Sequence, residues 1–303
     1  MDFDFKSILD LVKAFPDEAT CMAYLAEMRW NGNVISPFDE TSKVYTMKDG
    51  RYMCKNTKKY FNAKVGTIFE DTKIPLIKWY MSLYIFSSHK KGVSSHQLAK
   101  DIDVTQKTAW FMLHRLRFAF NTPAFKREFD GVVEIDEAYM GGEDKNKHAN
   151  KKSGKRGMGS NKTAVLGMKD RKTGRVKAQV IEKRSSENIY PILISSIEKD
   201  SIVVTDEAPV YDKLNTYFSH GRVTHSAKQY VNGMFHTNGI ENFWSHLKRG
   251  VDGIYHWVSK EHLQSYVDEF TLRYNTRKFT TSGRFDLVLS NVAGRLTYKE
   301  LIG

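Results

Sequence analysis

Apolar and polar positions change their spacing along the chain, and these changes predict where helices and strands lie. The clearest helix covers residues 238–250, where one face is formed by four apolar side chains at i, i+3, i+4 and i+7: Ile240, Phe243, Trp244 and Leu247. Glu241 and Lys248 are seven residues apart, so they share one side of this helix. The helix therefore presents a carboxylate and an ammonium group beside a stripe that packs on a core.

Strand and helix patterns alternate through the middle of the chain. The predicted elements are strands at 132–137, 163–168 and 175–181, a helix from 186, a strand at 201–206, a helix at 211–218 and a strand at 222–225. This order is that of an α/β ribonuclease-H-like fold, a mixed sheet with helices on both faces. Asp136 and Asp206 each come at the end of a predicted central strand. Because the carboxyl ends of parallel strands lie side by side, we expect the two aspartates to meet.

The first seventy residues predict helices followed by a small β module. Short strands at 43–45, 52–54 and 60–63, with a hairpin signal between the first two, are laid out like a zinc ribbon. However, the first metal-binding knuckle would be Ser36-Pro37-Phe38-Asp39, and the second contains only one cysteine, Cys54. One cysteine of four cannot hold a structural zinc ion, so we predict the β fold without the metal and expect no zinc.

Residues 71–122 predict a helix-turn-helix domain. An apolar helix at 74–86 precedes two shorter helices at 95–102 and 107–117, which are separated by a turn. The second of these would enter the DNA major groove by its N-terminal end, through four polar residues: Thr105, Gln106, Lys107 and Thr108. A plain helical hairpin is the alternative, and the charge of the chain favours DNA binding.

Composition supports a nucleic-acid partner. The 303 residues include 47 Lys and Arg against 35 Asp and Glu, a formal net charge of +12, and basic side chains neutralise phosphates. A glycine-rich loop after residue 141 is expected to lie along a phosphate backbone through Lys151, Lys152, Lys155 and Arg156. No apolar run approaches the ~18 residues of a membrane span, so no membrane partner is expected. The two cysteines cannot form a disulfide framework, which favours a reducing intracellular setting.

Asp136, Asp206 and Glu241 form the candidate catalytic set. Carboxylates brought together repel one another unless cations hold them, and oxygen-only ligands suit Mg²⁺, for which Mn²⁺ would substitute. Two such ions ~3.5–4 Å apart can activate an attacking water or hydroxyl and stabilise a leaving oxygen. Glu137 should point to the opposite side of its strand and could only support the ligands from behind. Asn238, one turn before Glu241, is an alternative third ligand, but a carboxylate binds magnesium better.

Three motifs carry a resemblance to a known family: EIDEAYMGG at 134–142, VVTDE at 203–207 and HTNGIENFWSHLKRG at 236–250. They resemble a DDE transposase of bacterial insertion sequences, from the ISXO-like group that is related to the eukaryotic Merlin transposases. The segment Gly66–Glu70 and the helix-turn-helix match the same layout, so the resemblance covers nearly the whole chain. It implies that Asp136, Asp206 and Glu241 ligate the metal ions, and that Lys248, with Arg249 beside it, contacts transposon-end DNA. The missing ribbon cysteines depart from the family pattern.

The predicted function is therefore that of a DNA transposase. It would bind terminal inverted repeats, hydrolyse the phosphodiester at the element ends and transfer the 3′-hydroxyl ends to target DNA. A homodimer or higher assembly is expected, in the cytoplasm of a bacterium and associated with the nucleoid. The predicted domains are the N-terminal helices with the β module (1–70), the helix-turn-helix domain (71–122), the catalytic domain (128–282) and a C-terminal tail (283–303). The alternatives are a nuclease or resolvase of the same fold without strand transfer, and a non-catalytic DNA-binding derivative.

Overall fold

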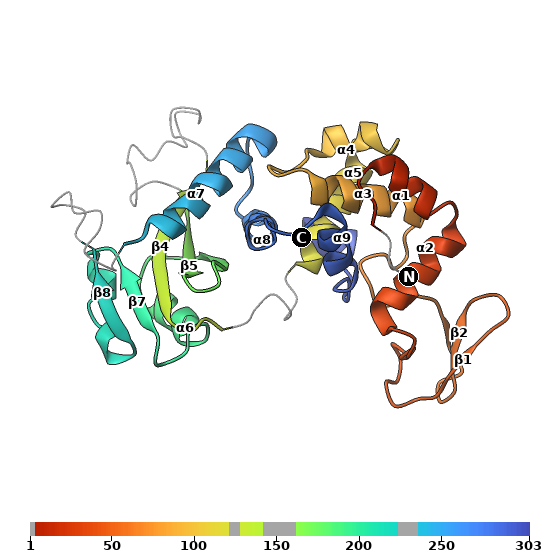
Figure 1. The fold of residues 1–303 in the computed structure, drawn as a ribbon, viewed down its shortest axis with the longest axis horizontal. Coiled ribbons are helices and arrows are strands. Elements are labelled where there is room, and N and C mark those ends of the chain that lie inside the picture. Colours follow the sequence, from red (N-terminus) through yellow and green to blue (C-terminus); the bar gives the residue numbers. More distant parts are fainter. Residues whose placement is uncertain (1–3, 121–127, 142–161, 224–235) are drawn as a thin grey trace. The chain divides into compact units, whose positions relative to one another are not determined.

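The chain forms two compact units. The computed structural model describes residues 4–120, 128–141, 162–223 and 236–303 (Figure 1). One unit comprises Met1–Thr122 together with Lys278–Gly303, and the other comprises Pro123–Arg277. The two predicted N-terminal domains thus form one unit, and the predicted C-terminal tail is an integral part of it. The physical reason is burial: Phe285 is fully buried, with its ring centroid 4.9 Å from that of Phe5 and 5.4 Å from that of Tyr80.

The first unit combines helices with a small antiparallel sheet. Its elements are α1 (Ile8–Ala14), α2 (Glu18–Trp30), β1 (Val44–Thr46), β2 (Tyr52–Cys54), β3 (Tyr60–Phe61), α3 (Leu76–Ser88), α4 (Ser95–Asp101), α5 (Gln106–Ala119), α9 (Thr281–Leu289) and α10 (Tyr298–Ile302). The sheet has the order β1-β2-β3. Side-chain oxygens of Ser94 and Thr105 accept hydrogen bonds from the first turns of α4 and α5, which explains where these helices begin.

Hydroxyl groups surround the cysteine of the β module. The Cys54 side chain is fully buried; burial raises the pKa of its thiol, but the neighbouring side chains of Ser36, Ser42 and Thr57 lower it to about 6. Two of these residues occupy the positions where a zinc ribbon would carry cysteines. Neutral hydroxyl groups are poor zinc ligands compared with thiolates, and the absence of zinc from this module stays a prediction.

The second unit is built on a mixed five-stranded sheet of order β6-β5-β4-β7-β8. The strands are β4 (Val132–Met140), β5 (Thr163–Asp170), β6 (Val176–Ile181), β7 (Ile202–Thr205) and β8 (Ser219–Arg222). The pairs of β4 with β7 and β7 with β8 are parallel, whereas β5 runs antiparallel to both β4 and β6. The helices are α6 (Ser186–Ile194), α7 (Asn238–Gly250) and α8 (Leu263–Asn275). This mixed α/β architecture agrees with a ribonuclease-H-like fold.

Two neighbouring elements of this unit differ from the predictions. The helix expected at 211–218 is replaced by two 3₁₀ turns, η5 (Pro209–Tyr211) and η6 (Leu214–Thr216), and the last strand lies earlier than expected, at β8. Tyr211, Leu214 and Phe218 all pack into one core, a spacing that short turns satisfy without a regular helix. The helix predicted at 238–250 has the same bounds as α7, and a π-helical turn, η8 (Val251–Tyr255), follows it directly.

Each face of the sheet has its own hydrophobic core. Successive side chains of β4 point to opposite faces, so this alternation decides which of the two cores each side chain enters. Val133 and Ile135 pack with α6 in one core, whereas Ala138 and Met140 pack with α7 and α8 in the other. By the same alternation, the side chains of even-numbered residues face α7. Glu134 and Asp136 therefore point toward α7, and Glu137 points toward the α6 side.

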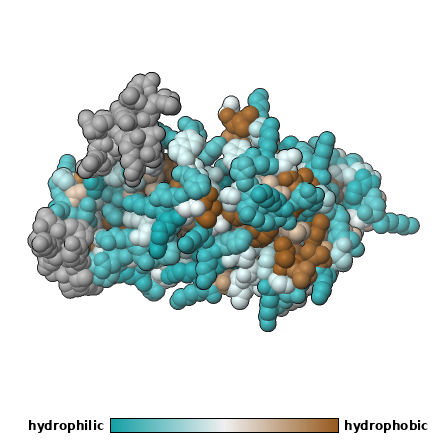
Figure 2. All heavy atoms as spheres, turned by 90° about the horizontal axis from the view of Figure 1, so that it is seen from above, coloured by the Kyte–Doolittle hydropathy of each residue, from teal (hydrophilic) through white to brown (hydrophobic). Residues whose placement is uncertain are grey.

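The surface in Figure 2 is mostly hydrophilic, with separate small apolar areas. Large apolar side chains that are exposed come from scattered elements, for example Leu9, Trp257 and Phe279. Among the residues that the structure describes, no helix combines the length and the hydropathy that crossing a bilayer requires.

Candidate active site

Asp136 lies on β4, and Asp206 directly follows β7, the parallel neighbour of β4. The register of β4 and β7 ends with the pair Glu134↔Val204, and each aspartate comes two residues later. Asp206 directly follows the end of β7, as predicted. Asp136, in contrast, does not end its strand, because β4 continues to Met140 through its pairing with β5. The prediction that β4 ends at Asp136 was therefore wrong. Both aspartates nevertheless come the same number of residues after the last pair of β4 and β7.

The environment of Asp136 penalises its negative charge. Burial, together with the nearby charges of Glu137 and Asp206, raises the pKa of this carboxyl to about 7, against the lowering effect of hydrogen bonds from the Glu137 backbone and the Trp244 indole. The indole Nε1 donates to Asp136 Oδ2 over 3.1 Å. A carboxylate that is buried beside other carboxylates is stabilised by a nearby cation.

Asp206 is held at both of its oxygens. Its Oδ1 accepts a hydrogen bond from the backbone N–H of Ala208 at 3.1 Å, and its Oδ2 lies 3.3 Å from an Arg184 guanidinium nitrogen. The same nitrogen of Arg184 lies 2.9 Å from Glu137 Oε2, and the Tyr211 hydroxyl donates to Glu137 Oε1 at 2.6 Å. Glu137 is thus engaged on the α6 side, where its side chain is only 2% exposed. Sequence reasoning missed Arg184, since it falls between two elements in no repeating pattern.

Glu241 lies in the first turn of α7, and its side chain is exposed. Its Oε1 accepts a hydrogen bond from the Thr237 hydroxyl at 3.0 Å. Trp244, the donor to Asp136, comes three residues later and is therefore a neighbour of Glu241 on the helix surface. Across the described ranges, with their gaps, no three His, Cys, Asp or Glu side chains are close enough together to hold a metal ion. Glu241 therefore does not complete a ready three-ligand cluster, and Asn238, also exposed, begins the same helix.

A buried carboxylate fixes the start of α7 to the sheet. Glu134 is 1% exposed, accepts the backbone N–H of Ile240 at 2.9 Å and lies 2.7 Å from Arg171 Nε. A negative charge at a helix N-terminus also interacts favourably with the helix dipole. Glu134 faces the same side of β4 as Asp136, and its carboxylate holds the start of α7.

Glycine permits close packing where α7 crosses β5. A Cβ atom added at Gly167 would lie 2.7 Å from Trp244 Cη2 and 2.9 Å from Ile240 Cδ1. Real Cβ atoms do not approach other atoms so closely, and an indole ring held in a core cannot easily move aside. The absence of a side chain at Gly167 therefore lets Trp244 reach Asp136.

The predicted DNA contacts fall into three groups. Lys248 and Arg249 are exposed near the end of α7, where Arg249 Nε donates to the Ser245 carbonyl at 3.0 Å. The four residues at the start of α5 make local contacts within the first unit. The loop residues Lys151, Lys152, Lys155 and Arg156 lie outside the described residues. Thr105 and Thr108 hydrogen-bond to each other at 2.9 Å, Gln106 donates to Ser95 Oγ at 2.8 Å, and the Lys107 ammonium lies 4.8 Å from the Tyr298 ring centroid.

Comparisons with known proteins agree with this architecture. The model of the ISXO2-like transposase domain matches residues 128–275, which include all the strands of the second unit. An uncharacterized protein in transposable element ISH50 of Halobacterium salinarum is 30% identical over 277 residues, covering 86% of this chain and 92% of that protein. An uncharacterized transposase-like protein of Haemophilus influenzae is 35% identical over 102 residues, covering 33% of this chain and 81% of that protein.

One solved structure is also similar, a simian T-cell lymphotropic virus intasome in complex with PP2A regulatory subunit B56 gamma. It is 13% identical with a TM-score of 0.29, and the match covers 63% of this chain and 68% of that chain. A TM-score this low supports no conclusion about this chain. The family match and the Halobacterium relative, which is similar over most of both chains, are sufficient to assign the chain to a family. The chain belongs to the ISXO2-like transposase family.

Proposed function

We propose that this protein is a DNA transposase of an insertion sequence that cleaves DNA at the ends of its element. In this proposal it binds the terminal inverted repeats, hydrolyses the phosphodiester at each end and joins the freed 3′-hydroxyl ends to target DNA. The observation that carries the proposal is that Asp136 and Asp206 each come two residues after the last pair of the parallel strands β4 and β7, and that the charge of Asp206 raises the pKa of Asp136. The helix that bears Glu241 and Lys248 is attached beside them through the hydrogen bond from Trp244 to Asp136.

The donor chemistry of these residues fits magnesium. Asp136, Asp206 and Glu241 offer only oxygen atoms, which hard divalent cations prefer. The crowding that raises the pKa of Asp136 is also what a bound cation would relieve. Mg²⁺ ions held there, or Mn²⁺ in their place, would supply Lewis-acid stabilisation of the charge on the reacting phosphate. With Glu241 as third ligand the set contains three carboxylates, and Asn238 is the alternative on the same helix.

The remaining residues of the site position these ligands. Arg184 orients the Asp206 carboxylate and balances the charge of Glu137, which is turned to the α6 side. The bond from Ile240 to Glu134 fixes the first turn of α7, and with it the position of Glu241. Lys248 lies two turns further on and is exposed, so it is available to neutralise a phosphate of the bound DNA strand.

End recognition is assigned to the first unit. Its helices α4 and α5 stand where the helix-turn-helix was predicted, and α5 is exposed mainly at its start while the side chains from Met112 to Arg117 are buried. Only the N-terminal end of α5 could then approach base edges, in keeping with the predicted docking. The net charge of +12 favours duplex DNA as the partner. Because transposition joins two ends, we propose a homodimer or larger assembly at the DNA.

The test is an assay that separates cleavage from joining. Purified protein is incubated with Mg²⁺, labelled terminal-repeat DNA and a supercoiled target plasmid. A transposase gives nicks at the repeat ends and labelled DNA joined to the plasmid. Cleavage without joined products would instead support a nuclease or resolvase, and binding without either product would support a non-catalytic derivative.

A further inference from the structure

The C-terminal segment 290–303 packs against α5 and pairs through its backbone with residues 66–68 of the first unit. Thr67 and Ala293 form an antiparallel bridge, the backbone N–H of Ile68 donates to Val292 O at 3.0 Å, and that of Gly294 donates to Gly66 O at 3.0 Å. Gly294 has φ +103°, and a Cβ atom there would lie 2.7 Å from a ring carbon of Phe118 on α5. The segment therefore follows a path that only a glycine permits at this point.

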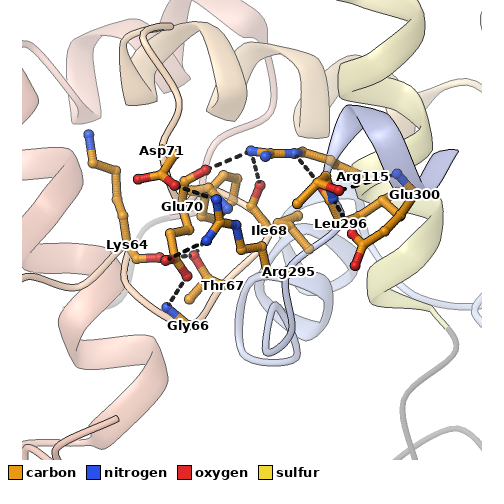
Figure 3. A network of polar contacts seen from close by, with 12 residues as sticks. Lys64, Gly66, Thr67, Ile68, Glu70, Asp71, Arg115, Arg295, Leu296 and Glu300 are labelled. Atoms are coloured by element: carbon orange, nitrogen blue, oxygen red, sulfur yellow. Dashed lines mark hydrogen bonds and ion pairs between the residues drawn. The ribbon is translucent and has the colours of Figure 1, made fainter. Parts of the chain in front are cut away.

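An arginine of α5, Arg115, also binds the C-terminal segment through its side chain. Arg115 is 5% exposed, and its Nη1 donates to the carbonyls of Ile68 and Glu70, each at 2.9 Å, while its Nε donates to the Leu296 carbonyl at 3.0 Å (Figure 3). Arg295, from the same C-terminal segment, forms ion pairs with Glu70 and Asp71. The buried guanidinium thus satisfies three carbonyl groups from two distant parts of the chain, which fixes the segment relative to α5.

Rings and cations then alternate along one face of α5 toward its exposed end. The Arg115 guanidinium lies 4.7 Å from the Phe111 ring centroid, and Phe111 meets Tyr298 edge-to-face at 5.5 Å and 87°. The ammonium of Lys107 lies 4.8 Å from the Tyr298 ring centroid. Tyr298 itself begins α10, whose start is fixed by reciprocal hydrogen bonds between Thr297 and Glu300. Lys107 therefore reaches a ring that the C-terminal segment supplies.

We propose that Tyr298 positions Lys107 for contact with a phosphate of the element-end duplex, so that the C-terminal segment is part of the DNA-binding surface. This inference rests on the proposed function, which supplies the DNA partner. A lysine ammonium on a flexible stem loses conformational freedom when it binds a phosphate, and a ring that already holds it lowers that cost. A cation over an aromatic face keeps its charge and most of its donors free. Lys299 follows Tyr298 and is exposed, which adds a second cation to the same surface.

The experiment measures affinity for terminal-repeat duplex over a range of salt concentrations. Lys107→Ala should weaken binding and reduce the slope of log affinity against log salt by about 1, as expected for one lost phosphate contact. Tyr298→Ala should weaken binding about 2- to 5-fold, the size of an exposed cation–π contact. Tyr298→Phe keeps the ring and should bind as the wild type does. The double variant Lys107→Ala with Tyr298→Ala should lose no more than Lys107→Ala alone, because both changes remove one coupled contact.

Tyr298→Leu addresses the packing role of the side chain. Leu retains apolar volume against Phe111 but has no aromatic face, so it should weaken binding as Ala does while its melting temperature stays near that of Tyr298→Phe. Wild-type affinity in Tyr298→Leu, additive losses in the double variant, or no loss in Lys107→Ala would each overturn the inference. Failure of the wild-type protein to bind terminal-repeat duplex would instead contradict the proposed function.

Discussion

Replacement of Asp136 by Asn is expected to stabilise the metal-free protein. Asn retains an oxygen that can accept the Trp244 indole hydrogen bond, but it carries no negative charge beside Glu137 and Asp206. Active sites commonly sacrifice stability in this way for chemistry. The sign of the effect follows from the pKa of Asp136, which is higher in the folded protein than in the unfolded chain. The wild type is therefore not destabilised by this group below the unfolded pKa, and it loses stability as the pH rises through the folded pKa. Asn cannot ionise, so the variant escapes this loss.

The magnitude follows from the same shift. The pKa of Asp136 rises from 3.8 to about 7, and each pKa unit corresponds to about 1.4 kcal/mol, so the upper bound above pH 7 is about 4 kcal/mol. Asp136 is only partly buried, and solvent screening reduces this to about 2 kcal/mol. For a unit of the size of Pro123–Arg277, that corresponds to a rise in melting temperature of about 4–8 °C. The gain should shrink between about pH 7 and pH 4, the window set by the two pKa values.

Thermal unfolding of both proteins in EDTA, at pH 8 and at pH 5, measures this effect. Asp200→Asn is the matched control, because Asp200 is an exposed carboxylate in the same unit. Added Mg²⁺ should raise the melting temperature of the wild type at pH 8 more than that of Asp136→Asn. If Asp136→Asn melts at or below the wild-type temperature at pH 8, or if its gain does not shrink at pH 5, the account of the carboxylate cluster is refuted.

Three further substitutions test how the site is held. Gly167→Ala should lower the free energy of unfolding by about 1–3 kcal/mol, since the added methyl overlaps Trp244, and unchanged denaturant unfolding would show that α7 can shift freely. Arg184→Met should lower the free energy of unfolding by about 3–5 kcal/mol, because the buried Glu137 carboxylate loses this cation. Thermal unfolding would detect the loss, and a variant as stable as the wild type would contradict it. Glu134→Gln should cost about 1–3 kcal/mol through the lost ion pair, and hydrogen exchange in the first turn of α7 should quicken, whereas unchanged exchange would argue that other contacts fix that helix.

Regular elements with a strong period could be predicted from the sequence. The apolar stripe of α7 is buried as expected, with Ile240, Phe243 and Leu247 fully buried and Trp244 only 4% exposed. A stripe of this kind has one face that can be removed from water, so local spacing is sufficient to define it. The strands β4 to β7 could likewise be predicted from their alternation and their bounding turns, whereas β8 lies earlier than predicted.

Features that depend on distant partners could not be predicted. β4 extends past Asp136 because β5 pairs with it as far as Met140, and nothing within the strand itself signals that length. The C-terminal segment joins the first unit although the second unit precedes it in the chain, because Phe285 completes a core made by Phe5 and Tyr80. Chain order alone suggested a separate tail.

The charged residues that support the site were equally hidden. Arg184 and Arg171 belong to no periodic pattern in the sequence, and their roles arise only when folding brings Glu137 and Glu134 next to them. Asp136 and Asp206 could be proposed because each follows an apolar strand run, which is a local signal. The companions of these aspartates follow from tertiary contacts, which a single sequence does not display.

The central claim is that Asp136 and Asp206 together direct the cleavage of DNA at the ends of the element. The most direct measurement is the cleavage of end-labelled terminal-repeat DNA with Mg²⁺ by the wild type, Asp136→Asn, Asp206→Asn and the control Asp200→Asn, at protein concentrations that saturate the DNA. The account predicts nicks at the repeat ends with the wild type and the control, and none with either site variant although both bind the DNA. Cleavage at the wild-type rate by Asp136→Asn or Asp206→Asn would contradict it.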